Sequence, residues 1–371
     1  MDAIDDTVGR RSRGLSRRAF ARALAAVGLG FVTIPVWTRR ARAAGEVTVF
    51  TWAGYEVPEL HQAYVEKYGG PPVFNFFGEE EEALQKMRAG YNPDLAHPCY
   101  NSVVRWRDFG ILKPIDVSRL KHWPDVWDTL KALATSKSDG KVWFMPFDWG
   151  NSSLLYRTDL VDINEESWSL LLDERYKGRL SVFDSVDAAA AISGMLSGAR
   201  DPFNMTGDEM EKARDVLKRI HGNLRFWWTD QTSIEQALAS GELVAAYAWN
   251  ASVVALRNEG VPVAYMRPKE GILTWVCGLS LAKDAPGDEQ AAYDVLDAFL
   301  DPRSGGYMIN DYGYGHSNRK SYDSVSTERL AELGIAGNPE DHLRSGVFFD
   351  QIEPTIREKL IAIFETVKAG G

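Results

Sequence analysis

The sequence predicts a protein of the α/β class with largely parallel strands, divided into two domains. The chain has 371 residues, more than a single hydrophobic core usually holds, so two domains of about 150 residues each are expected. Short apolar runs alternate along it with segments of helical periodicity. This alternation is typical of sheets whose strands are joined through helices.

Residues 1–44 do not share this pattern. Ser16–Phe20 carries paired arginines, Ala23–Thr38 is uncharged, and Ala41–Ala43 offers small residues at the spacing that a signal peptidase needs. The uncharged run has 16 residues, fewer than the roughly 20 that span a bilayer. We therefore predict an export signal of the twin-arginine type, removed near Ala43–Ala44. An ordinary secretory signal and a membrane anchor are the alternatives.

The mature chain is strongly acidic. Removal of the signal takes away nine arginines and three aspartates, so the net charge goes from -10 to about -16. Nucleic acids need clustered lysine and arginine opposite their phosphates, so no nucleic-acid partner is expected. The negative charge is compatible with a cationic ligand.

The first part of the mature chain is predicted to alternate strands and helices. Val47–Phe50 is the first strand, and Pro58 then stands where the first turn of a helix tolerates proline. Val73–Phe77 is a second strand, and the acids of Glu79–Glu82 suit the positive end of the helix that follows. Asp94–Ala96 is a third, short strand.

The remainder continues in the same way. Arg179–Phe183 reads as a strand that leads into the helix-forming run Ala188–Ala191. Val244–Trp249 and Thr274–Ala282 are further strands, and if there are two lobes, short strands should cross between them. Other helices are expected over Met210–Ile220, Ile234–Glu242, Ala291–Leu300 and Ile352–Val367.

Familiar catalytic motifs are missing from the sequence. There is no phosphate-binding loop, no nucleophile elbow and no zinc-protease motif, and the six histidines lack metal-ligand spacing. We therefore predict neither an enzyme nor a metal or cofactor site. A hydrolase with paired carboxylates stays an alternative, because 52 acidic residues offer many pairs.

Large aromatic residues recur at the predicted strand ends. Ligands of open α/β sheets bind beyond the carboxyl ends of the strands. Ring faces bury methylene groups and attract ammonium groups by about 0.5–2 kcal/mol each. One such ring is more often core than site, but the shared position predicts a cleft for an organic amine. The rings are Trp52, Tyr55, Tyr100, Trp149, Trp249 and Trp275, with Tyr314 in a later loop.

Six motifs in their order along Glu46–Gly371 resemble the spermidine/putrescine-binding family of periplasmic receptors. They are Thr51-Trp-x-x-Tyr55, Pro146–Gly150, Tyr176–Gly178 before Leu180–Asp184, Ser240–Glu242 with Trp249–Asn250, Pro268–Gly271 before Trp275, and Gly313–Gly315. The resemblance implies a two-lobe periplasmic binding protein fold of type II with a ligand cleft between the lobes. Lobe one would comprise 46–147 plus 276–325, and lobe two 148–275 plus 326–371. It also implies a periplasmic monomer that performs no chemistry and serves the permease of an ABC importer in the inner membrane.

The resemblance also implies a set of ligand-binding residues. The rings would hold the carbon chain of a polyamine or related small amine, and the two acids would neutralise its ammonium groups. The set is Trp52, Tyr55, Tyr100, Asp184, Asp187, Trp249, Trp275 and Tyr314.

Several positions depart from the family's pattern. Cys277 stands where the family has a carboxylate, Phe349 where it has an amide, and Pro98 where it has a small hydroxyl residue. Ser185 and Ala188 occupy the positions of its acid pair unless the alignment slips by one residue. The acids that could compensate are Asp148, Asp230 and Glu79–Glu82.

Some alternatives stay open at this point. Cys99 and Cys277 can form a disulfide in an exported protein, but the sequence gives no distance between them. The ligand could instead be an amino acid derivative, or ferric iron held by Tyr312 and Tyr314. A secreted enzyme on a similar scaffold, and a receptor that serves a membrane sensor, are the other readings.

Overall fold

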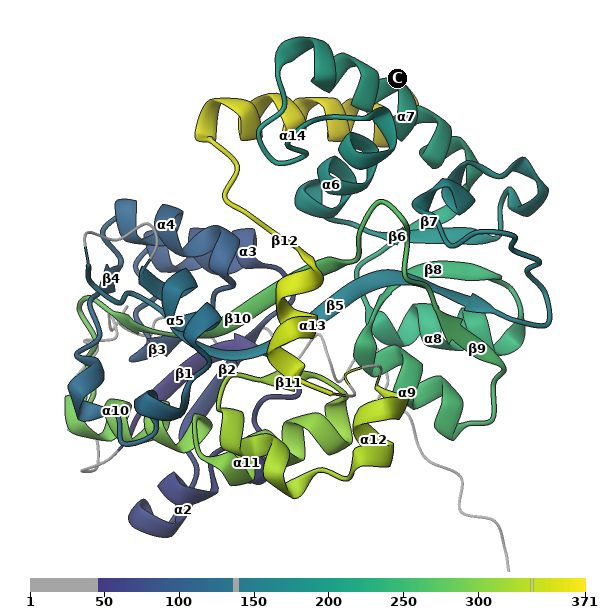
Figure 1. Ribbon diagram of the computed structural model, residues 1–371. Helices are drawn as coiled ribbons and strands as arrows, with labels where there is room; N and C mark the ends of the chain where they lie inside the picture. The colour runs from purple at the N-terminus through teal and green to yellow at the C-terminus, as the bar shows by residue number, and fades with distance from the viewer. Residues whose placement is uncertain (1–45, 136–139, 334, 336) are drawn as a thin grey trace, which may run out of the picture. The chain divides into compact units, whose positions relative to one another are not determined.

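One mixed sheet runs through the part of the chain that the computed structural model describes, residues 46–135, 140–333, 335 and 337–371 (Figure 1). The predicted export signal lies outside these residues. The main strands, in spatial order, are β2 (Val73–Phe77), β1 (Thr48–Trp52), β3 (Leu95–Ala96), β10 (Leu273–Ala282), β5 (Met145–Arg157), β8 (Ala245–Trp249), β6 (Leu180–Phe183) and β7 (Leu224–Trp228). Four short strands pair with β10 or β5: β4 (Leu112–Lys113), β12 (Val347–Phe348), β9 (Val263–Tyr265) and β11 (Gly315–His316).

The prediction of largely parallel strands is wrong for the centre of the sheet. Near its two ends β1 pairs in parallel with β2 and β3, and β6 with β7 and β8. In the centre β5 and β10 run antiparallel to each other, β10 antiparallel to β3, and β5 antiparallel to β8. These crossing strands are 13 and 10 residues long, not short as expected. Helix and strand alternation reports local crossovers and says nothing of strands that return from distant parts of the chain.

The buried apolar residues form two large clusters. The first draws on residues 47–149 and 276–343, and the second on residues 154–273 and 349–360. Strand β5 belongs to both, because Trp149 packs in the first cluster and Leu154 in the second. Ile335 and Leu343, which the sequence assigns to lobe two, pack in the first cluster. The lobe boundaries themselves stay a prediction.

Helices surround both clusters. Those around the first are α2 (Gln62–Tyr68), α3 (Glu80–Arg88), α4 (Tyr100–Asp108), α5 (Asp128–Thr135), α10 (Glu289–Phe299), α11 (Pro302–Tyr307), α12 (Thr327–Glu332) and α13 (Pro339–Ser345). Those around the second are α6 (Val186–Ser197), α7 (Gly207–Asn223), α8 (Gln231–Ser240), α9 (Asn250–Asn258) and α14 (Pro354–Lys368). Figure 1 shows α6, α7 and α14 on one face of β6–β8, with α8 and α9 on the other.

Local sequence signals explain where these helices begin and end. The Glu79 carboxylate caps α3 by accepting from the backbone N–H groups of Glu81 and Glu82. Gly69 ends α2 and Gly241 ends α8, both with left-handed φ values near 78° and 77°. Among the described residues, no helix combines the length and apolar character that crossing a membrane would require.

Candidate ligand-binding site

Four aromatic rings from three parts of the chain form a continuous series. The ring centroids of Tyr55 and Tyr312 are 6.1 Å apart, those of Tyr312 and Tyr314 are 6.0 Å apart, and those of Tyr314 and Trp275 are 4.8 Å apart. Gly313, with a left-handed φ of 67°, turns the backbone between the two later tyrosines. Three of the predicted site residues, Tyr55, Tyr314 and Trp275, thus belong to one set of rings.

A second set of rings stands at the ends of three adjacent strands. Phe183, Trp228 and Trp249 are the last residues of β6, β7 and β8. Their centroids lie 4.6 Å apart for Phe183 and Trp228, 5.3 Å for Phe183 and Trp249, and 5.0 Å for Trp228 and Trp249. Of these three rings, only Trp249 is a predicted site residue. Phe183 also ends a predicted strand, so the same signal would have found it, whereas no strand is predicted over Leu224–Trp228 and Trp228 carried no such signal.

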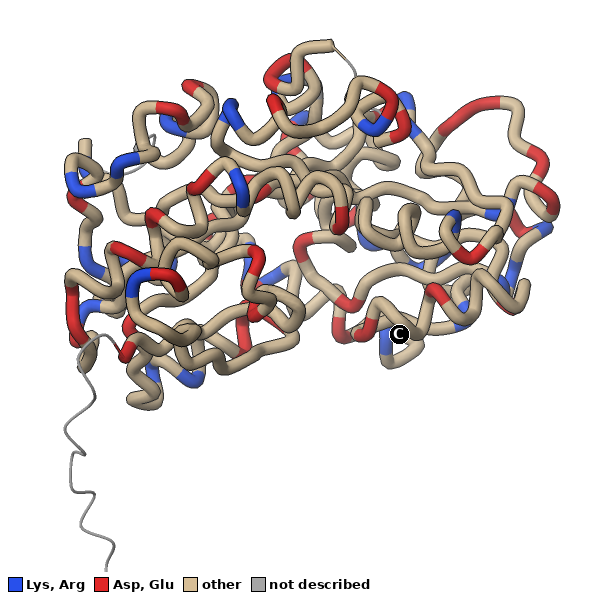
Figure 2. Tube along the Cα trace, turned by 90° about the horizontal axis from the view of Figure 1, so that it is seen from below, with Lys and Arg blue, Asp and Glu red and all other residues tan. Residues whose placement is uncertain are grey.

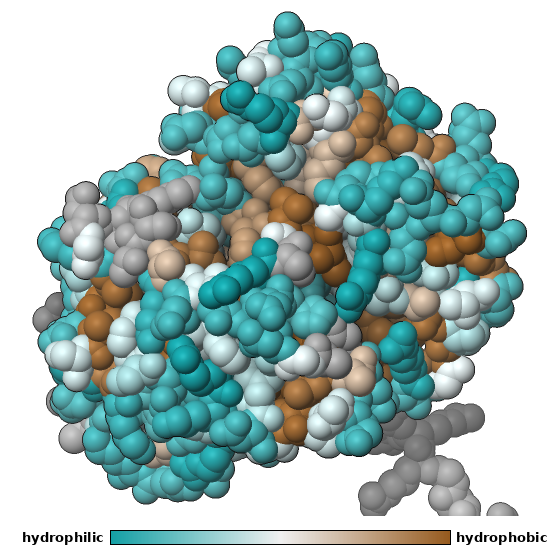
Figure 3. Space-filling model, in the orientation of Figure 1, coloured by the Kyte–Doolittle hydropathy of each residue, from teal (hydrophilic) through white to brown (hydrophobic). Residues whose placement is uncertain are grey.

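The two sets meet at the junction of the two clusters. Among the residues that the structure describes, Trp249 and Trp275 are the partly buried apolar residues that pack against both clusters. They lie opposite Ser152 and Gly150 of β5, two residues apart, and so on one face of the sheet. A Cβ atom at Gly150 would lie 2.8 Å from Trp275 Cε2, so the indole rests on bare backbone. Figure 3 shows apolar residues gathered between α13 and α14, over these strands.

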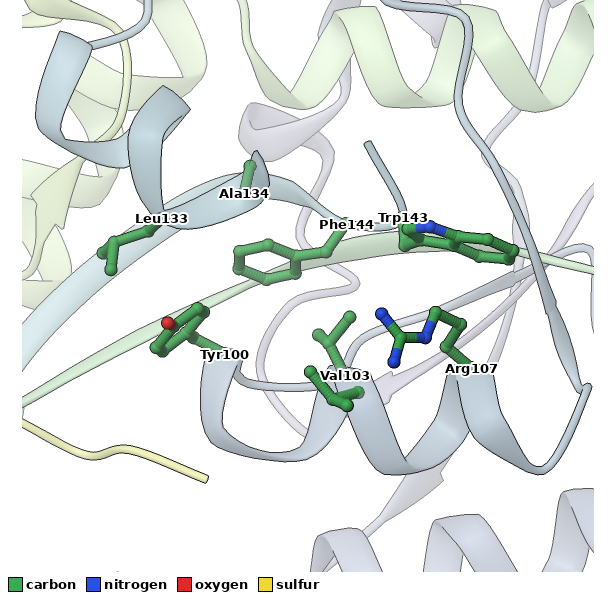
Figure 4. A pocket seen from close by; sticks show the side chains of 8 residues that line it. Tyr100, Val103, Arg107, Leu133, Ala134, Trp143 and Phe144 are labelled. Carbon is green, nitrogen blue, oxygen red and sulfur yellow. The ribbon is translucent and has the colours of Figure 1, made fainter. Parts of the chain in front are cut away.

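Two other predicted rings are placed differently. Trp52, the last residue of β1, packs its ring edge to face with Phe77 at a centroid distance of 4.7 Å. Tyr100 does not end a strand but begins α4. Its side chain lines a pocket with Phe144 and Leu133 (Figure 4). That cavity measures about 20 Å³, room for a single water molecule rather than an amine.

The prediction that Trp149 is a strand-end ring is wrong. The residue lies inside β5 and is 2% exposed, because β5 continues for eight residues beyond it into the second cluster. Its ring packs on Gly315, where a Cβ atom would fall within 2.5 Å of the indole. Trp149 therefore serves the core.

Both predicted ligand acids are bound to cations of the chain's last helix. Asp184 accepts from Lys368 Nζ through both carboxylate oxygens, at 2.7 and 3.0 Å. Asp187 pairs through Oδ1 with Arg357 Nη1, and its Oδ2 accepts from Asn101 Nδ2 at 2.7 Å. The tube view shows acidic and basic segments next to one another near the C-terminus (Figure 2). Neither carboxylate has an oxygen that lacks a partner.

A series of buried polar contacts links Tyr55 to β1. The Tyr55 hydroxyl donates to Asp148 Oδ2, and Asp148 Oδ1 lies 3.6 Å from His97 Nε2. His97 Nδ1 in turn contacts the Thr51 hydroxyl at 2.8 Å. Burial, followed by the negative charge of Asp148, raises the pKa of Tyr55 well above its usual value. Asp148 is fully buried, so it does not supply an accessible acid in place of the missing one.

The positions that depart from the family's pattern have structural roles here. Cys277 forms a disulfide with Cys99, which answers the question that the sequence left open. The Ser185 hydroxyl caps α6 at the backbone N–H of Ala188, at 3.4 Å. Phe349 is 8% exposed and packs in the second cluster. None of these three side chains offers a charge to a ligand.

The tyrosines proposed for ferric iron are poorly suited to it. Burial raises the pKa of Tyr312 and of Tyr314, which opposes the phenolate form that binds iron. The Tyr312 hydroxyl also donates to the carbonyl oxygen of Gly54. Among the described residues, no group of three or more histidine, cysteine, aspartate or glutamate side chains could hold a metal ion.

Comparison with known proteins agrees with this architecture. The family described as bacterial extracellular solute-binding protein matches residues 60–334. A putrescine/agmatine-binding protein of Pseudomonas aeruginosa is 26% identical over 321 residues, which are 80% of this chain and 83% of that protein. A putative spermidine/putrescine ABC transporter structure from Listeria monocytogenes has a TM-score of 0.77 at 19% identity, covering 88% of this chain and 100% of its own. The periplasmic binding protein MotA of A. tumefaciens, solved with glucopine, has a TM-score of 0.67 at 16% identity, covering 87% and 99%.

The structural matches confirm the predicted fold class, a mixed α/β periplasmic binding protein. They do not test individual side chains. The eight ligand-binding residues therefore stay a prediction, of which Tyr55, Trp249, Trp275 and Tyr314 are brought together by the fold.

Proposed function

Because the chain belongs to the bacterial extracellular solute-binding protein family, we propose that it is the receptor of an ABC importer for a polyamine or a related small organic amine. The family consists of solute-binding proteins and not of enzymes. The observation that carries the proposal is the junction of Trp249 and Trp275, the two partly buried rings that pack against both clusters. Rings in this position can bury a carbon chain and attract an ammonium group.

The names of relatives support an amine ligand. The Pseudomonas relative is named for putrescine and agmatine, and a second relative, from Escherichia coli, is a putrescine-binding protein 24% identical over 342 residues. The structure solved with glucopine indicates that the same fold also accepts other solutes. We therefore keep an amino acid derivative as the second candidate.

The mechanism in this proposal is closure of two lobes over the ligand. Strands β5 and β10 would act as the hinge, because both continue from one cluster into the other. Contacts across the opening would hold the closed form. Asn101 on α4 donates to Asp187 on α6, and Arg357 on α14 lies 4.0 Å from Glu81 on α3.

The proposal is tested by titrating the mature protein with putrescine, spermidine, 4-aminobutyrate and a panel of amino acids, followed by tryptophan fluorescence and calorimetry. We expect saturable binding of at least one amine. Trp249→Ala should weaken it about 5- to 30-fold, since a ring on a cation contributes up to about 2 kcal/mol. Trp123→Ala is the matched control, because this partly buried ring packs against the first cluster and not the second. Binding of solutes without an amino group, and of no amine, would contradict the proposal.

We also propose that the protein acts in the periplasm as a monomer and delivers its ligand to a permease in the inner membrane. Intact mass of the exported protein should correspond to cleavage near Ala43–Ala44. Uptake of labelled ligand by cells should require both this protein and the permease. Cells that respond to the ligand without taking it up would favour a membrane sensor as the partner.

A further inference from the structure

The Asp184 carboxylate already holds an ammonium group that belongs to the protein. Lys368 Nζ lies 2.7 and 3.0 Å from its two oxygens, and 4.9 Å from the centroid of the Phe364 ring. An ammonium between a carboxylate and a ring is the arrangement expected for a bound amine. Here the chain itself fills it. The side chains of Asp184 and Lys368 are each about one quarter exposed, so solvent screens the pair only in part.

The Asp187 carboxylate is also fully engaged. Arg357 and Asn101 each bind one of its oxygens, and the Arg357 side chain is 14% exposed. Arg357 reaches this position from the first turns of α14, the helix that ends at Lys368. One helix therefore neutralises both acids that the sequence analysis assigned to the ligand.

The acids that could compensate have partners of their own or lie in water. Glu79 caps α3, Glu81 pairs with Arg105 at 2.5 Å, and Asp230 is exposed at the start of α8. Glu80 binds the backbone N–H of Cys99 and the Ser102 hydroxyl. Among the described residues, no hydrogen bond joins these carboxylates to Trp249 or Trp275, so a second ligand ammonium buried at the junction would lack a countercharge from them, which disfavours its burial.

The ring junction presents the opposite need, a hydrogen-bond acceptor. The indole Nε1 atom of Trp275, one of its two rings, is buried and has no hydrogen-bond partner among the residues that the structure describes. A buried donor without an acceptor is destabilising, and an oxygen atom of a ligand would satisfy it.

From these contacts we propose that the ligand carries a single ammonium group and ends in an oxygen acceptor, as an amino alcohol or an amino-acid-like zwitterion does, and is not a polyamine. This inference rests on the proposed function, because it assumes that the ring junction binds an amine. The ring faces hold the ammonium end, and the Trp275 indole N–H donates to the oxygen end. Lys368 and Arg357 take the place of the further positive charges that a polyamine would bring.

The test compares three four-carbon ligands by calorimetry on the mature protein at low ionic strength. Putrescine and 4-amino-1-butanol have the same number of heavy atoms and differ only in one terminal group, ammonium or hydroxyl. 4-Aminobutyrate replaces that end with a carboxylate. We expect 4-amino-1-butanol or 4-aminobutyrate to bind with a dissociation constant at least about tenfold lower than that of putrescine.

A substitution then tests the role of the chain's own ammonium. Lys368→Gln leaves Asp184 without its cation, so putrescine should gain about tenfold in affinity relative to 4-amino-1-butanol. Lys359→Gln removes the same charge from an exposed position of the same helix and should leave that ratio unchanged.

The outcomes separate the inference from the function on which it rests. Tighter binding of putrescine than of both oxygen-ended ligands, in the unsubstituted protein, overturns the inference and leaves an amine receptor. An unchanged ratio in Lys368→Gln also overturns it, because Lys368 then does not substitute for a ligand ammonium. Binding of a solute without an ammonium group, and of none of the three amines, overturns the proposed function and the inference together.

Discussion

Replacing Tyr55 by phenylalanine removes the hydroxyl group that donates a hydrogen bond to the buried Asp148 carboxylate. Asp148 is fully buried, and the Tyr55 hydroxyl is its one side-chain hydrogen-bond donor among the described residues, since its other oxygen has no such partner. A hydrogen bond to a charged group contributes about 1.5–3 kcal/mol. We expect Tyr55→Phe to lower the free energy of unfolding by about 2–3 kcal/mol. The ring itself stays, so aromatic contacts with a ligand are preserved.

The size of the effect can be read from thermal unfolding. At about 2.1 cal/mol/K per residue over roughly 320 folded residues, the unfolding entropy is about 0.7 kcal/mol/K, so Tm should fall by about 3–4 °C. Tyr312→Phe is the matched control. Its hydroxyl donates to a neutral acceptor, the carbonyl oxygen of Gly54, so about 1 kcal/mol and a fall of 1–2 °C are expected. Equal losses in the two variants would refute the special role of the buried charge.

Three further predictions concern pH, packing and the disulfide. Burial lowers the pKa of His316 to about 4, so the stability that its neutral ring provides above pH 6.5 should be lost as the pH falls towards 4, by up to about 3 kcal/mol. Urea unfolding at pH 7 and at pH 4.5 measures this loss. A His316→Gln variant whose stability has the same pH dependence would contradict the prediction. Gly150→Ala should displace the Trp275 indole, lower the free energy of unfolding by about 1–3 kcal/mol and weaken ligand binding. Wild-type affinity for an amine in this variant would contradict the prediction. Because 178 residues separate Cys99 from Cys277, replacing both by serine should lower the free energy of unfolding by about 2–5 kcal/mol, and reductant should then have no further effect on the variant.

Elements set by local signals were predictable from the sequence. Strand β1 and strand β2 lie where their apolar runs indicate, and α8 stops at Gly241. Pro58 begins a short 3-10 turn before α2 rather than the helix itself. Such signals depend on residues a few positions apart, which is the range over which backbone propensity and capping act.

Contacts between distant residues were not predictable in the same way. Lys368 lies 184 residues from Asp184, and Arg357 lies 170 residues from Asp187, so nothing local marks either pair. The family resemblance therefore assigns both acids to the ligand. The length of β5 was also not predictable from the sequence, because polar Asn151, Ser152 and Ser153 interrupt its apolar pattern in the middle of the strand.

Both clusters include residues from the C-terminal part of the chain, and this limits how early each can be completed during synthesis. The first cluster needs residues up to Leu343, and the second needs Leu360 on the final helix. Neither core can be completed while the C-terminal part of the chain is still being synthesised. A nascent chain that has reached β5 but not β10 lacks the strand that pairs along much of β5, and an open strand edge of this kind invites aggregation. Completion of both clusters must therefore follow synthesis of nearly the whole chain.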